Sequence, residues 1–187
     1  MASLYALAVL GLTLGAFTMG RARAVNAAGG QLSVLHSLPV YHGLLAATLV
    51  LLPLAAVYAI GAPLVAKLAI DGSLALMPAE IAADALRRGV AVRDIQNLAA
   101  GRHSGAVTPE LRAAADAYLA SRSAGAWSLL SAGIVLAGLA LAGVLVRISP
   151  AFRARNAFEW LVKALLLACA AIAILTTIGI VFSVVYE

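Results

Sequence analysis

Four long runs of apolar residues constrain what this chain can fold into. They cover Leu4–Gly20, Leu44–Ile70, Ala126–Val146 and Leu161–Val185. A helix of roughly 20 residues crosses the hydrocarbon core of a bilayer, and only the first run is short for that task. The sequence therefore predicts an all-α, polytopic membrane protein with about four transmembrane helices.

The composition agrees with a protein whose surroundings are mostly lipid. Of the 187 residues, 64% are hydrophobic and 11% are charged, against roughly 25% charged in an average soluble domain. The net charge of +5 does not form a basic patch with exposed aromatic residues, so we expect no nucleic-acid partner. The single cysteine, Cys169, lies inside an apolar run, which excludes an intrachain disulfide and a thiolate metal site.

The arginines indicate how the chain is oriented. No Lys or Arg precedes the first run, whereas Arg21 and Arg23 follow it, which favours an uncleaved first helix over a signal peptide. Three more arginines follow the third run. Because positively charged loops stay in the cytoplasm, we expect cytoplasmic loops at 21–43 and 147–160. Both termini would then be periplasmic, in a bacterial inner membrane.

This pattern predicts three parts of the chain. Residues 1–70 would form two transmembrane helices, of which the second ends near Pro63 because proline interrupts a helix. Residues 126–187 would form two more. Between them, residues 71–125 would form a periplasmic helical segment, in which six acidic residues balance six arginines.

Helix start and stop signals divide this middle segment. Pro78 starts a helix that would stop at Gly89, and a short helix at 94–100 would be closed by Gly101. A third helix would cover Thr108–Ser121. We expect the three helices to pack on each other or on the spans; the alternative is a docking surface for another protein.

The third helix has the best-marked start of the three. Thr108 suits the N-cap, where a hydroxyl accepts from a free backbone N–H. Pro109 suits the first helical position, where its missing N–H costs nothing. We therefore expect this helix to begin at Pro109.

The segment "LHSLPVYHG" holds two of the three histidines. His36 and His42 lie six residues apart with Pro39 between them, so they share no helical face and match no common zinc spacing. No carboxylate or cysteine lies between Arg23 and Lys67. We therefore expect no metal here, but a turn that places Tyr41 and His42 at the level of the lipid headgroups.

No pattern in the sequence predicts an enzyme. His103 and Ser104 are adjacent, and neighbours in sequence rarely point at a common atom. No glycine-rich phosphate-binding loop of the Walker type occurs. We expect no catalytic residue, no cofactor and no metal.

Two segments together carry a family resemblance. "LHSLPVYHG" and "FRARNAFEWLVKALLLACAAIAILTTIGIVFSVV" resemble the amino-terminal region of the PstC-type permease subunit of the phosphate-specific ABC transporter, in its long proteobacterial form. The motif positions, to which we assign a structural role, are His36, Pro39, Tyr41, His42, Gly43, Arg153, Arg155, Asn156, Thr176, Thr177 and Gly179.

The resemblance implies a membrane component of a phosphate importer. Besides the lipid bilayer, the implied partners are a second permease subunit, a cytoplasmic ATPase subunit and a periplasmic phosphate-binding protein. Such a permease continues into further spans and a coupling loop, whereas this chain stops at Glu187, so we expect it not to transport phosphate alone. No phosphate-contacting residue can be assigned. The alternative is a freestanding membrane adaptor or regulator that binds a partner through its periplasmic helices.

Overall fold

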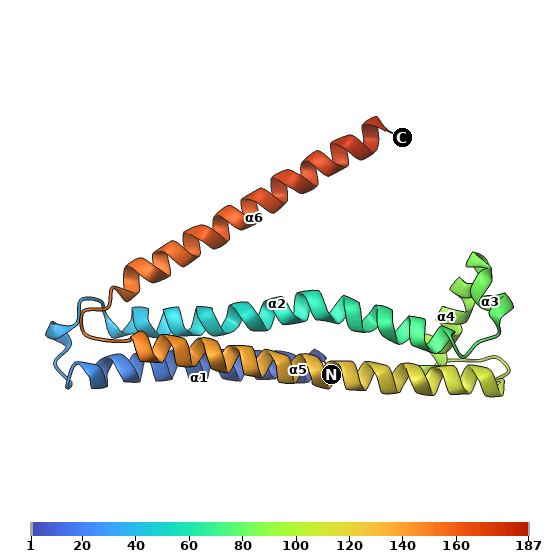
Figure 1. Ribbon diagram of the computed structural model, residues 1–187, viewed down its shortest axis with the longest axis horizontal. Helices are drawn as coiled ribbons and strands as arrows, with labels where there is room; N and C mark the ends of the chain where they lie inside the picture. The colour runs from blue at the N-terminus through green and yellow to red at the C-terminus, as the bar shows by residue number, and fades with distance from the viewer. Residues whose placement is uncertain (1, 187) are drawn as a thin grey trace. The chain divides into compact units, whose positions relative to one another are not determined.

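Apolar runs of membrane-spanning length fold here into long single helices. The structure, a computed structural model, describes residues 2–186. Its elements are α1 (Ala2–Ala27), the 3-10 helix η1 (Leu32–Val34), α2 (Pro39–Leu74), α3 (Ala79–Ala83), α4 (Ala85–Ala99), α5 (Pro109–Arg147) and α6 (Ala154–Val185) (Figure 1). By length and hydropathy, α1, α2, α5 and α6 are able to cross a membrane. The predicted all-α fold, with four spans and short helical structure between spans 2 and 3, is confirmed.

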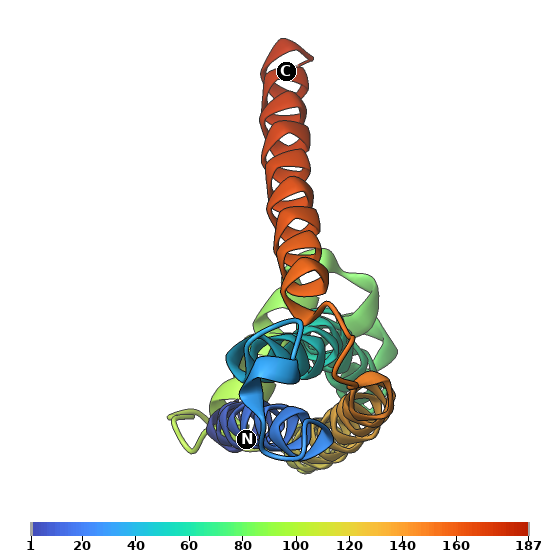
Figure 2. The same ribbon diagram turned by 90° about the vertical axis from the view of Figure 1, so that its left-hand side faces the viewer.

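Contacts divide the described chain into two compact units. Unit 1 contains residues 2–10 and 51–138, which include the second half of α2, α3, α4 and most of α5. Unit 2 contains residues 11–50 and 139–186, which include most of α1, η1, the start of α2 and α6. Every described residue from Leu165 onward is exposed, so α6 packs on its unit mainly through its first turns (Figure 2).

The expected end of the second span near Pro63 is wrong. Helix α2 contains both Pro53 and Pro63 and continues to Leu74. Each proline removes one backbone hydrogen bond. A broken helix in hydrocarbon would leave more backbone groups unpaired than these two positions do, and this favours a continuous helix.

The helices also extend beyond the apolar runs at the two arginine-bearing connections. Helix α1 continues through Arg21 and Arg23 to Ala27, because the alanine-rich sequence there favours helix. Helix α6 begins at Ala154, ahead of its apolar run. The connections that remain are shorter than the loops expected from the sequence: 28–38 between α1 and α2, and 148–153 between α5 and α6.

In the middle segment, Asp84 sets the helix boundary that we had expected at Gly89. The helix that follows Pro78 ends at Ala83, and the Asp84 carboxylate accepts hydrogen bonds from the backbone N–H groups of Leu86 (2.8 Å) and Arg87 (3.3 Å). An N-cap of this kind stabilises a helix by about 1 kcal/mol, enough to offset a glycine inside it, which costs about as much. Helix α4 therefore runs through Gly89 and ends, as expected, just before Gly101, which has a positive φ of 68°.

Helix α4 packs on the spans rather than standing free. Its Ala91 and Ile95 are buried against Leu74 at the end of α2 and against Leu111 and Ala114 on α5. Figure 1 shows α3 and α4 beside these two helix ends. This cluster gives the apolar face of α4 a partner within the chain, as the first of the two alternatives predicted.

Helix α5 begins where the sequence predicts but does not end there. The Thr108 hydroxyl accepts from the backbone N–H of Leu111 over 3.2 Å, and Pro109 is the first helical residue. The helix then continues to Arg147 without a break near residue 125. The predicted helix Thr108–Ser121 and the third span are therefore one helix.

Candidate functional site

Two connecting segments of unit 2, far apart in the sequence, contact each other. The backbone N–H of His36, before α2, donates to the carbonyl of Pro150, before α6, over 3.0 Å. The backbone N–H of Arg155, in the first turn of α6, donates to Ser37 Oγ over 3.3 Å. We call this region the loop junction. It joins the two segments on which the family resemblance depends.

Ser37 supplies a cap that α6 lacks in its own sequence. The N-cap residue of α6, Arg153, makes no capping hydrogen bond with its side chain. The first N–H groups of any helix have no partner inside the helix, and Ser37 Oγ, which belongs to a buried residue, accepts from one of them. A residue 118 positions earlier therefore fixes where α6 begins.

Removing this cap is expected to loosen the start of α6. For Ser37→Ala we predict a loss of about 1 kcal/mol, seen as roughly fivefold faster hydrogen exchange at the first amides of α6. Ser33→Ala is the matched control, because Ser33 lies in η1, which has no buried residue. Unchanged exchange at the Arg155 amide in Ser37→Ala would contradict the assignment of the cap.

The two histidines, His36 in the α1–α2 loop and His42 in the first turn of α2, have different environments. His42 is fully buried, with Nδ1 3.3 Å from the carbonyl oxygen of Leu38 and its ring centroid 6.0 Å from that of Phe152. His36 is exposed and joins the junction through its backbone. The His42 side chain packs inside unit 2 near Phe152 of the α5–α6 linker, and its expected position at the level of the lipid headgroups stays a prediction.

An exposed ion pair, Arg155 with Glu159, lies beside the junction. The Arg155 guanidinium lies 5.8 Å from the centre of the Tyr41 ring, and its Nε donates to Glu159 Oε1 over 2.7 Å. Exposed pairs of this kind contribute little to stability. They do hold the Arg155 side chain against the start of α2, beside the position that Ser37 caps.

Close contact between α1 and α2 depends on two glycines. A Cβ on Gly43 would lie 2.8 Å from the carbonyl oxygen and the ring of Phe17. A Cβ on Gly20 would lie 2.8 Å from the carbonyl oxygen of His42 and from Ala46 Cβ. Glycine at both positions lets the backbones approach closely, which is how small residues bring membrane helices together.

The remaining motif positions are divided between the junction and the far part of α6. Pro39 is buried at the first position of α2, whereas Arg153 and Asn156 are exposed at the start of α6. Thr176 and Thr177 donate hydrogen bonds to carbonyls of their own helix, and a Cβ on Gly179 would have no neighbour within 4 Å. The structure therefore brings the loop and the α6 lead-in together but leaves these last three positions apart.

Several residues of the junction and of the neighbouring α1–α2 contact carried no signal in the sequence. Ser37 and Phe152 lie inside or beside the quoted motifs, but a single serine or phenylalanine is ordinary in a loop. Gly20 and Phe17 lie in the first apolar run, where alanine and glycine are frequent. Only contacts across the fold single them out.

The junction is built for packing and orientation. Its central side chains are His42, Phe152, Tyr41 and Arg155. Across residues 2–186, no three His, Cys, Asp or Glu side chains lie close enough together to hold a metal ion. What the contacts achieve is to hold the first turns of α6 against the start of α2.

Comparison with known proteins gives one match. The sequence profile of the family described as "Phosphate ATP-binding cassette transporter" matches residues 5–176. No curated protein matches the chain, and no solved structure matches it. The matched residues cover most of the chain, including the loop junction, two of the four spans in full and most of the other two. The chain therefore belongs to the phosphate ATP-binding cassette transporter family, as a protein with four helices able to cross a membrane.

Proposed function

We propose that this chain is the amino-terminal membrane domain of a PstC-type permease subunit of a bacterial phosphate importer. The family match over residues 5–176 is the observation that carries this proposal. The loop junction supports it, because the two segments that resemble the permease are also the two that contact each other. In this role the domain contributes no catalysis and is not sufficient for transport.

The contacts of the junction also support one orientation in the membrane. The α1–α2 loop and the α5–α6 linker touch through His36 and Pro150, and connections in contact lie on the same side of a bilayer. Arg21 and Arg23 in the last turns of α1, with the arginines around the linker, favour the cytoplasm for that side. The segment with α3 and α4, and both termini, would then be periplasmic.

We propose that the junction positions α6 for the rest of the importer. Its first turns are capped and packed, whereas the remainder exposes large apolar side chains such as Leu167, Ile174 and Val181. Lipid covers such a surface, and so do other transmembrane helices. The partners in this proposal are the second permease subunit, the cytoplasmic ATPase and the periplasmic phosphate-binding protein.

The proposal is tested with a tag placed on the protein at its native locus. We expect the ATPase and the second permease subunit of the phosphate importer to co-purify with it, and not with an equally tagged, unrelated membrane protein. Expressed alone in a strain without phosphate importers, the 187-residue chain should give no radiolabelled phosphate uptake above background. Uptake by the chain alone, or purification without either subunit, would contradict the proposal.

Reporter fusions check the orientation within the same test. A fusion at Ala100, just after α4, should give alkaline phosphatase activity, which requires the periplasm. A fusion at Ser149, in the α5–α6 linker, should give none and should instead give cytoplasmic fluorescence of a fluorescent protein. The reverse pattern would overturn the orientation.

A further inference from the structure

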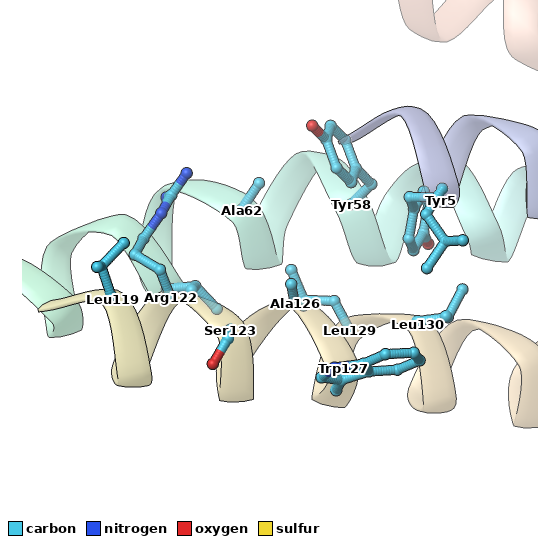
Figure 3. Close-up of a pocket in the computed structure, with 12 residues that line it drawn as sticks. Tyr5, Tyr58, Ala62, Leu119, Arg122, Ser123, Ala126, Trp127, Leu129 and Leu130 are labelled. Atoms are coloured by element: carbon cyan, nitrogen blue, oxygen red, sulfur yellow. The ribbon is translucent and has the colours of Figure 1, made fainter. Parts of the chain in front are cut away.

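Unit 1 contains an apolar groove between three helices. It has a volume of about 270 Å³ and is lined by Leu4 and Tyr5 of α1, by Tyr58 of α2 and by residues of α5 such as Trp127 and Leu130. Figure 3 shows Tyr5 and Tyr58 on one side and the α5 residues on the other. This size is close to the lower end of ordinary ligand pockets, roughly 300–1,000 Å³.

Two hydroxyl groups along the groove are already paired within the chain, and most of the side chains that line it are apolar. The Tyr5 hydroxyl donates to the carbonyl of Leu54 over 2.7 Å, and the Ser123 hydroxyl donates to the carbonyl of Ala120 over 2.9 Å. Tyr5 therefore offers only its ring, which lies 4.9 Å from the ring of Tyr58. A ligand in the groove would have to be apolar along this length.

The groove ends in a second hollow of different character. This hollow has a volume of about 430 Å³ and is lined by Gln96 of α4 and Arg102 after it, and by Tyr118, Leu119 and Arg122 of α5 among others. Leu119 and Arg122 line both spaces. In Figure 3, Arg122 extends from α5 beside Leu119, at the opposite end of the groove from Tyr5.

Two arginines of the middle segment are paired with acidic residues, whereas the two arginines of the hollow are not paired with any described residue. Arg87 pairs with Asp84 and Arg88 pairs with Asp71. For Arg102 and Arg122 there is no salt bridge within the described part of the chain, and no carboxylate lines either space. The hollow is therefore positively charged and suited to an anion.

The position along α5 places this anion site at the edge of the bilayer. Arg122 is the last charged residue before the apolar run Ala126–Val146. Trp127, which lines the groove, is 56% exposed, and tryptophan is enriched at membrane–water interfaces. The charged end of the site thus lies at the level of the headgroups, and the groove lies within the hydrocarbon.

We propose that unit 1 binds one anionic phospholipid, with its phosphate at Arg102 and Arg122 and an acyl chain in the groove. An amphiphile fits both spaces at once, because the apolar groove and the charged hollow share Leu119 and Arg122. Free phosphate would use the hollow alone and would leave the apolar groove without a role. The site binds the leaflet next to α3 and α4.

The test measures which lipid the purified 187-residue chain retains. The protein in mild detergent is mixed with equal amounts of phosphatidylglycerol and phosphatidylethanolamine, and bound lipid is counted by native mass spectrometry. We expect phosphatidylglycerol to be preferred. Each arginine near a membrane surface contributes about fivefold to binding an anionic lipid, so Arg102→Gln with Arg122→Gln should lower retention about 25-fold.

Matched variants distinguish binding at this site from non-specific electrostatic attraction between anionic lipid and the positively charged chain. Arg112→Gln removes an exposed charge from α5 outside both spaces and should leave retention unchanged, and lysine at both 102 and 122 should preserve it. Ala126→Phe fills the groove and should lower retention of both lipids. Ala124→Phe, on the exposed side of α5, should not.

Three results would overturn the proposal. The first is equal retention of the two lipids by the unsubstituted chain. The second is a loss of phosphatidylglycerol retention in Arg112→Gln as large as in the variant with Arg102→Gln and Arg122→Gln. The third is unchanged lipid retention in Ala126→Phe. A further experiment adds excess inorganic phosphate. Bound lipid should remain. Displacement of the lipid by phosphate would also overturn the proposal, because it would assign the hollow to a free anion. Circular dichroism of each variant checks that helical content is preserved.

Discussion

Replacing His42 by alanine is expected to lower the free energy of unfolding by about 3 kcal/mol, the range found when large buried side chains are truncated. The imidazole is fully buried and packs against Phe152. Alanine would leave a cavity between the start of α2 and the α5–α6 linker. Denaturant unfolding of the chain in mixed micelles, followed by circular dichroism, measures the change.

A second substitution at the same position separates packing from polarity. Nε2 of His42 has no hydrogen-bond partner among the described residues, and a buried polar atom left unpaired costs about 1–3 kcal/mol. His42→Phe keeps a ring of similar size and removes this atom, so its stability should be close to that of the original chain or higher. It loses only the long contact with the Leu38 carbonyl.

His36→Ala is the control, because His36 is exposed and contributes its backbone N–H to the junction. We expect a change within about 0.5 kcal/mol, as for most surface substitutions. If His36→Ala and His42→Ala destabilised the chain equally, the assignment of His42 as a buried packing residue and of His36 as an exposed one would be wrong. If His42→Phe were as damaging as His42→Ala, the role of His42 would be polar rather than packing.

Adding a side chain at Gly43 is expected to separate α1 from α2. A Cβ at this position would lie 2.8 Å from the carbonyl oxygen of Phe17, and a backbone atom cannot move aside as a side-chain end can. Overpacking of this kind costs about 1–3 kcal/mol, so we expect about 1–2 kcal/mol for Gly43→Ala and about 3 kcal/mol for Gly43→Val. The same unfolding assay measures both.

Gly15→Ala is the matched control on α1, because a Cβ there would have no neighbour within 4 Å. It should be neutral or stabilising by up to about 1 kcal/mol, since alanine favours helix over glycine. Gly20→Ala, on the other side of the same contact, should resemble Gly43→Ala. The double variant should cost less than the sum, because one shift of the helices relieves both clashes. Full additivity would mean that the two glycines do not share a contact.

The parts of the fold that the sequence predicts are those set by local chemistry. Apolar runs predict four spans, Thr108 and Pro109 predict the start of α5, and Gly101 predicts the end of α4. The errors occur where local signals compete. The Asp84 carboxylate caps a new helix, α4, which continues through Gly89, where we expected a helix to end. Helix α2 continues through Pro63, because a break within the hydrocarbon would leave more backbone groups unpaired.

The candidate sites depend on contacts that no local pattern contains. The equal numbers of acidic residues and arginines in the middle segment suggest that every arginine forms an ion pair. In the structure, Arg87 and Arg88 do form ion pairs. Arg102 and Arg122 instead line a hollow without carboxylates. Equally, the family resemblance links the histidine loop with the lead-in to α6, but the residue that joins them is Ser37. A balance of charges along a sequence does not specify pairing in space.

The cap that Ser37 gives to α6 also has a consequence for the order of assembly. Ser37 and Arg155 are 118 positions apart, so the acceptor is synthesised and inserted long before its donor exists. Closing so long a connection is entropically costly and slow compared with forming local turns. The loop must therefore remain available, with its serine unused, until the fourth span emerges, and docking of that span is the step that completes this end of the domain.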